Sequence, residues 1–174
     1  AAGAAIKRGL AKGAPPEVDV ASFPAALREQ RATFITFKKN DALRGWIGSI
    51  TAHRALIDDV VANAYAAAFK DPRFPPLQED ELDSLTLSIS LLGKPEEMTF
   101  ENETGFIDQI RPGADGLIIE DQGRRAVFLP QVWEDLPTKP QFLAHLKQKA
   151  GLAADHWSPG FKAWRFTATS LYPT

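Results

Sequence analysis

The sequence predicts an α+β fold in which a mixed but mostly antiparallel β-sheet is flanked by helices. Pairs of strand-like segments are joined by short polar turns, one further segment alternates strictly between apolar and polar residues, and single helices separate these strands. With 174 residues, of which 44% are hydrophobic and 24% charged, the chain has the size and composition of one globular domain.

Three segments predict the principal helices. Residues 1–12 are rich in alanine and precede Gly13, a residue typical of helix ends. Residues 53–70 carry apolar residues at helical spacing, and Thr51 is a plausible cap for this helix. The third helix is predicted after Thr138, which is followed by Pro140 in the first turn and by Gly151 beyond the end. Shorter helical segments are expected within 24–31, 100–110 and 130–136.

The strands are predicted in hairpins. TFITFKK at 33–39 and ALRGWIGSI at 42–50 flank the polar pair Asn40-Asp41, which favours a tight turn. The alternating segment SLTLSISLL at 84–92 predicts a strand with one buried face. GLIIE and RAVFL, joined by DQGR, predict a second hairpin, and 162–172 predicts a closing strand.

The segment 42–50 is unusual for a strand, because Arg44, Gly45, Trp46 and Gly48 lie in its middle. Glycine inside a strand weakens it and often marks a close approach of another backbone or of a ligand. We therefore expect Gly45 and Gly48 to face such a neighbour, and we include all four residues among the candidate site residues.

Composition excludes several kinds of chemistry. The chain has no cysteine, so disulfides, thiolate metal sites and a cysteine nucleophile are excluded. A net charge of -2 argues against a broad nucleic-acid surface, although Gly45 and Gly48 have the spacing of a GxxG loop. No apolar segment is long enough to cross a bilayer, so we expect no membrane partner and a cytoplasmic location.

Arginines in turns and loops are the main candidate ligand contacts. Arg44 precedes a glycine, Arg73 lies in the proline-rich segment DPRFPP, and Arg111 begins the turn RPGADG. A guanidinium group can bind a carboxylate or phosphate through two parallel hydrogen bonds. The alternative for each arginine is an internal salt bridge with one of the 22 acidic residues.

Histidine chemistry is weakly indicated. His145 lies beside the apolar face of its predicted helix, one turn before Lys149, and is either a ligand contact and base or a partly buried helix residue. The three histidines are far apart in sequence, so no metal site is predicted. No sequence motif indicates a particular cofactor, which stays unknown.

Five longer segments add a resemblance to these observations. They are LRGWIG at 43–48, NAYAAAFKDPRFPPL at 63–77, RPGADGL at 111–117, FLPQVWE at 128–134 and HLKQKAGL at 145–152. Together and in this order they resemble the AMMECR domain family, known in bacteria and archaea as AmmeMemoRadiSam system protein A. The resemblance covers about residues 30–170.

The resemblance implies one AMMECR-type domain over residues 1–174, with a larger and a smaller lobe and a cleft between them. It also implies a radical SAM protein and a Memo-type protein as partners. The family signature LRGCIG has cysteine where this chain has Trp46. A cysteine-thiolate mechanism is therefore excluded here, and we expect the larger Trp46 side chain to point into available space instead of a packed core.

The resulting hypothesis is that the protein binds or acts on a small anionic ligand in the inter-lobe cleft. Its predicted contacts come from residues 43–48, the loop arginines and His145. Whether the protein is an enzyme is left open. The alternative is a non-catalytic interaction or regulatory module in which Trp46 contacts a partner protein. A nucleic-acid-associated domain is a third reading, which the acidic net charge makes the least favoured.

Overall fold

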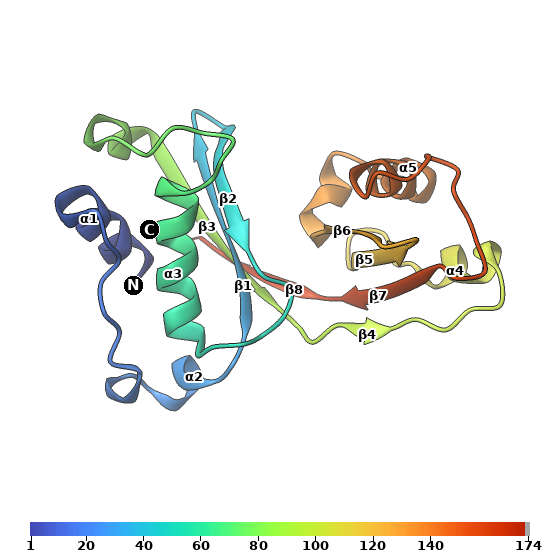
Figure 1. The fold of residues 1–174 in the computed structure, drawn as a ribbon, viewed down its shortest axis with the longest axis horizontal. Helices are drawn as coiled ribbons and strands as arrows, with labels where there is room; N and C mark the ends of the chain where they lie inside the picture. Colours follow the sequence, from blue (N-terminus) through green and yellow to red (C-terminus); the bar gives the residue numbers. More distant parts are fainter. Residues whose placement is uncertain (173–174) are drawn as a thin grey trace. The chain divides into compact units, whose positions relative to one another are not determined.

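The computed structural model describes residues 1–172 and confirms the α+β class (Figure 1). The chain forms two compact units. The first comprises residues 1–92 together with the chain from residue 169, and the second comprises residues 93–168. Each unit has its own four-stranded sheet and its own hydrophobic core.

The first unit contains a sheet in the strand order β2-β1-β3-β8, in which β1 is antiparallel to both β2 and β3. Its strands are β1 (Ala32–Lys39), β2 (Ala42–Gly48), β3 (Leu85–Leu92) and β8 (Ala168–Leu171). Its helices are α1 (Ala2–Lys12), η1 (Val20–Ser22), α2 (Ala25–Arg28), α3 (Leu56–Phe69) and η2 (Glu79–Ser84).

The β1–β2 hairpin is the one that the sequence predicts. Asn40 and Asp41 both have positive φ, 50° and 65°, as the tight turns favoured in hairpins require. The register then shifts, because Lys38 pairs with Leu43 while Phe37 pairs with Gly45. Arg44 is the additional residue in this β-bulge, which re-aims its side chain.

Alternation in β1 separates the two faces of this sheet. Ile35 and Phe37 belong to the hydrophobic core that α3 covers, whereas Phe34 and Thr36 point to the opposite face. Helices α1 and α2 both pack against α3, so the α-helices of this unit gather on one side (Figure 1). Phe34 and Thr36 therefore lie on the face opposite α3.

Helix α3 begins later than predicted, and the assignment of Thr51 as its cap is wrong. The N-cap residue is Ala55, whose side chain makes no capping hydrogen bond. The Leu56 N–H instead donates to the Glu29 carbonyl oxygen at 2.7 Å. A backbone carbonyl distant in sequence thus satisfies a helix N-terminal donor that a side chain would ordinarily satisfy.

The second unit contains a sheet in the order β4-β7-β5-β6 with antiparallel ladders. Its strands are β4 (Glu96–Glu97), β5 (Gly116–Asp121), β6 (Arg124–Phe128) and β7 (Lys162–Phe166). Its helices are α4 (Glu103–Gln109), η3 (Pro130–Glu134) and α5 (Lys139–Lys149). Thr138 caps α5 as predicted, since its side chain accepts a hydrogen bond from the Gln141 N–H.

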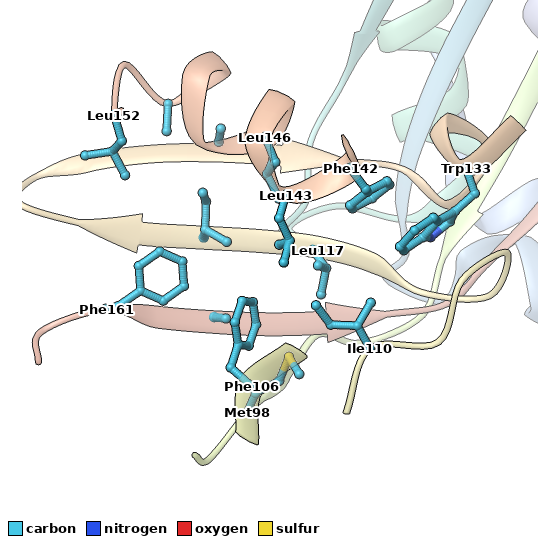
Figure 2. Packing of buried hydrophobic residues seen from close by; sticks show 14 residues of the cluster. Met98, Phe106, Ile110, Leu117, Trp133, Phe142, Leu143, Leu146, Leu152 and Phe161 are labelled. Atoms are coloured by element: carbon cyan, nitrogen blue, oxygen red, sulfur yellow. The ribbon is translucent and has the colours of Figure 1, made fainter. Parts of the chain in front are cut away.

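Aromatic and aliphatic side chains form the core of the second unit (Figure 2). Trp133 and Phe142 stack with ring centroids 3.9 Å apart, and the Trp133 indole N–H donates to the Asp115 carbonyl oxygen at 2.7 Å. This core has its own aromatic cluster, and among residues 1–172 no residue of α3 belongs to it.

The predicted closing strand is divided between the two sheets. β7 pairs with β5 in the second sheet, whereas β8 lies beside β3 in the first. Thr167 separates them, and its carbonyl oxygen accepts a hydrogen bond from the Gly93 N–H at 2.7 Å. No helix found within residues 1–172 is sufficiently long and apolar to cross a membrane.

Candidate functional site

Two of the segments that carry the resemblance meet at the free edge of β2. The Trp46 N–H donates to Asp71 Oδ2 at 3.0 Å, and the Trp46 carbonyl oxygen accepts from Arg73 Nη2 at 3.1 Å. β2 is an edge strand, and its polar backbone groups would otherwise be available for pairing. The side chains of Asp71 and Arg73 thus satisfy the backbone of Trp46 as a neighbouring strand would.

Asp71 and Arg73 form a side-on ion pair. Arg73 Nε donates to Asp71 Oδ1 at 3.0 Å, and Arg73 Nη2 donates to Asp71 Oδ2 at 2.7 Å. The Arg73 guanidinium lowers the pKa of Asp71 to about 2 against the opposing effect of burial, and the N–H groups of Trp46 and Arg73 add to this lowering. Asp71 is therefore ionised at neutral pH, and it fixes the orientation of the Arg73 guanidinium.

Arg44 is held by a second carboxylate. Its Nε and Nη2 donate to the two oxygens of Glu81, both at 3.0 Å, and Nη2 also donates to the Pro75 carbonyl oxygen at 2.8 Å. Lys39 Nζ lies 3.2 Å from Glu81 Oε1. Hydrogen bonds from Arg44, followed by that from the Gln78 N–H, lower the pKa of Glu81 to about 2. Arg44 is buried, and its guanidinium is paired with Glu81.

Phe74 brings these two ion pairs together. The Cζ atom of Arg44 lies 5.9 Å from the centre of the Phe74 ring, and that of Arg73 lies 5.5 Å from it. We call the group Lys39, Arg44, Asp71, Arg73 and Glu81 the charge cluster. It contains three cations against two carboxylates, so it carries an excess of positive charge in an acidic protein.

The two glycines of β2 allow close approach of neighbouring backbone. A Cβ atom on Gly45 would collide with the Ala67 carbonyl oxygen of α3, and one on Gly48 would collide with the Thr33 carbonyl oxygen of β1. Both neighbours are backbone, which has little freedom to move. The sequence predicted either another backbone segment or a ligand close to each glycine. The structure shows a backbone carbonyl oxygen beside both Gly45 and Gly48.

Trp46 is only partly buried and lies outside the hydrophobic core of the first unit. It stacks on Phe34 with ring centroids 4.7 Å apart and an interplanar angle of 22°. Arg73 Cζ lies 5.8 Å from the centre of the Trp46 ring. The bulky side chain is thus accommodated on the face opposite α3, where a packed core does not enclose it.

The remaining two predicted site residues belong to the second unit. Arg111 forms an ion pair with Asp115, with Nη2 and Oδ1 2.7 Å apart, and this pairing raises the pKa of Arg111. His145 is exposed, and its Nδ1 lies 2.9 Å from the Gln141 carbonyl oxygen one turn earlier in α5. The structure brings Arg44, Gly45, Trp46, Gly48 and Arg73 together in the first unit.

The second unit also contains a small polar cluster. Asp121 Oδ2 accepts hydrogen bonds from Ser158 Oγ and His156 Nε2, the latter at 2.7 Å. Burial raises the pKa of Asp121, but the hydrogen bonds from Ser158 and His156, the charge of His156 and the Gln122 N–H together outweigh it, so the pKa is lowered. Ser158 contacts the carboxylate and not the imidazole, so the arrangement lacks the serine–histidine contact of a hydrolase triad.

Sequence reasoning missed Lys39 and the two carboxylates of the charge cluster, Asp71 and Glu81. Asp71 directly follows the predicted helix 53–70 and precedes Pro72, a position typical of a helix end, and Glu81 lies in the acidic segment 79–84 with no distinguishing pattern. Within residues 1–172 the structure contains no group of three or more His, Asp or Glu residues arranged to hold a metal ion.

Comparisons with known proteins match almost the whole chain. The AMMECR1 family model matches residues 1–171. A protein of Methanothermobacter thermautotrophicus is 37% identical over 151 residues, which cover 83% of this chain and 77% of the relative. Protein MJ0810 of Methanocaldococcus jannaschii is 37% identical over 160 residues, covering 87% and 78%.

A solved structure has the same fold. The crystal structure of uncharacterized protein PH0010 from Pyrococcus horikoshii superimposes with a TM-score of 0.87 at 34% identity, covering 97% of this chain and 86% of that chain. These relatives establish family and fold, and their names assign no activity.

Proposed function

We propose that this chain, which belongs to the AMMECR1 family, binds a small molecule bearing an acidic group at the charge cluster, where two of the segments that carry the resemblance meet. The observation that carries the proposal is the Arg73 guanidinium, which is oriented by Asp71 and still about half exposed, in a cluster whose excess positive charge comes from Lys39 and Arg44 around Glu81. The proposal concerns binding and assigns no reaction.

Arg73 is the proposed direct contact. Its side chain is 48% exposed, and its Nη1 has no hydrogen-bond partner within residues 1–172. Asp71 and the Trp46 carbonyl oxygen hold the other side of the guanidinium, so little side-chain entropy would be lost when an acid binds. Guanidinium groups offer paired donors that match carboxylates and phosphates.

Lys39 and Arg44 supply the remaining charge. Glu81 neutralises only one of these two cations, and the Lys39 side chain is 39% exposed. Arg44 is buried, so we assign it a positioning role between Glu81 and the Pro75 carbonyl oxygen. Arg111 and His145 stay predicted ligand contacts of the second unit, and the radical SAM and Memo-type partners stay predictions of the family resemblance.

Calorimetric titration with inorganic phosphate tests this proposal. Lys39→Met removes a partly exposed cation of the charge cluster without touching Arg73 and should weaken phosphate binding several-fold, on the order of 1 kcal/mol. The matched control is Lys12→Met, which removes an equal charge from an exposed residue in the last turn of α1, in the same unit. It should bind phosphate nearly as the unaltered protein does.

The result that contradicts the proposal is equally direct. If phosphate gives no saturable heat, or if the two variants lose the same affinity, the charge cluster is not the binding site. Both variants are first compared by thermal unfolding, so that a loss of fold is not mistaken for a loss of binding.

A further inference from the structure

The face of the first sheet opposite α3 carries a row of hydroxyl groups. Thr36 on β1 pairs across the ladder with Trp46 on one side and with Ser88 on the other. Ser90 pairs with Phe34 one step along the same face. Side chains directly opposite each other in antiparallel strands are close neighbours, so Trp46, Thr36 and Ser88 form a continuous line across three strands.

The hydroxyl of Thr36 is an unsatisfied buried group. Thr36 is 7% exposed, and its Oγ1 is buried without a hydrogen-bond partner among residues 1–172. An unpaired buried hydroxyl carries a desolvation penalty, so native proteins rarely retain one without a role for it. Valine has nearly the same shape and would fit an apolar position in a strand without this penalty.

Trp46 joins this hydroxyl to the charge cluster. Its cross-strand neighbour is Thr36, and its ring lies 5.8 Å from Arg73 Cζ. Neighbouring strands are about 4.8 Å apart. A ligand whose acidic group is held by Arg73 at the edge of β2 must therefore extend across one to two strand spacings to reach Thr36 on β1.

We infer that Thr36 is a second polar contact of the ligand, and that the ligand class is an elongated acid with a hydrogen-bonding group at the end opposite the acidic group. This inference rests on the proposed function and deepens it. Arg73 would select the acidic end, and the Thr36 hydroxyl would select the distal polar group by exchanging a hydrogen bond with it.

The first test is independent of the ligand. Thr36→Val removes only the hydroxyl, and the unfolding midpoint should stay unchanged or rise, because an unsatisfied group is lost. The matched control is Thr86→Val, the same change at an exposed position further along this face. If Thr36→Val lowers the midpoint while Thr86→Val does not, the hydroxyl has a structural partner and the inference is overturned.

The second test uses phenylacetate and 4-hydroxyphenylacetate, which differ by one hydroxyl opposite the carboxylate. The benzene ring serves as a rigid spacer of about the required length. In the unaltered protein the hydroxylated probe should bind about fivefold more tightly, the effect of one neutral hydrogen bond. In Thr36→Val this preference should disappear, whereas in Thr86→Val it should persist.

The outcomes separate the two proposals. If both probes bind equally, or if the preference survives in Thr36→Val, the Thr36 inference fails; the acid site still stands if Lys39→Met weakens both probes. If neither probe nor phosphate binds, the proposed function fails and the inference fails with it. Loss of the preference in Thr36→Val alone supports the inference.

Discussion

At the scale of single residues, the signature segment is explained largely by contacts within the first unit. Gly45 admits the carbonyl oxygen of Ala67, and the backbone of Trp46 is satisfied by Asp71 and Arg73. The positions that looked most functional in sequence are therefore also structural. What they leave exposed is one side of Arg73, and the proposed ligand contact is placed there.

Replacing Gly45 with alanine should destabilise the protein by about 1–3 kcal/mol, the usual cost of overpacking. The added Cβ would collide with the Ala67 carbonyl oxygen, so β2 and α3 would have to separate. Urea unfolding measures this loss. Gly3→Ala is the control, because Gly3 lies in helix α1 with open space around it and should be neutral or slightly stabilising. Equal stability of the two variants would contradict the close approach seen at Gly45.

At the scale of elements, the edge of β2 is held by side chains from the loop after α3. This arrangement depends on ionised carboxylates, since the pKa values of Asp71 and Glu81 are both lowered to about 2. A carboxyl group with a lowered pKa in the folded state stabilises the protein above its unfolded pKa. That stabilisation is lost as the pH falls toward the folded pKa.

Acid titration of stability should therefore show a loss that begins near pH 4.5 and continues to about pH 2, on the order of 1–2 kcal/mol for each carboxyl after allowance for solvent. Asp71→Asn should be less stable at pH 7, because Arg73 loses its partner, and its stability should fall less steeply with acid. Urea midpoints measured from pH 2 to pH 7 give the dependence of stability on pH for the unaltered protein and for Asp71→Asn. Parallel curves for the two proteins would show that Asp71 contributes nothing to this dependence.

The elements that the sequence predicts best are those with local signals. The polar pair Asn40-Asp41 forms the predicted turn, and Thr138 caps α5 as its spacing indicates. The start of α3 was predicted wrongly because the donor of Leu56 is satisfied by the Glu29 carbonyl, a contact distant in sequence. The division of the closing strand at Thr167 was also missed, since alternation alone does not show which sheet a strand joins.

At the scale of the whole molecule, two units with separate cores divide the predicted site residues between them. The family resemblance correctly indicated the family and the α+β fold. It did not indicate which acid each arginine contacts, because Arg44 and Glu81 are brought together only by tertiary structure. The β-bulge that places the Arg44 side chain likewise depends on the pairing register of β1 and β2.

The most direct test of binding at the charge cluster is a proton–nitrogen NMR titration of the protein with inorganic phosphate at constant ionic strength. The Arg73 side-chain N–H signals and the Trp46 backbone N–H signal should shift and saturate together, because Arg73 contacts the Trp46 carbonyl oxygen. The indole N–H of Trp133, buried in the core of the second unit and bonded to the Asp115 carbonyl oxygen, serves as an internal reference. Small, unsaturated shifts of equal size at Arg73 and Trp133 would contradict a specific acid-binding site at Arg73.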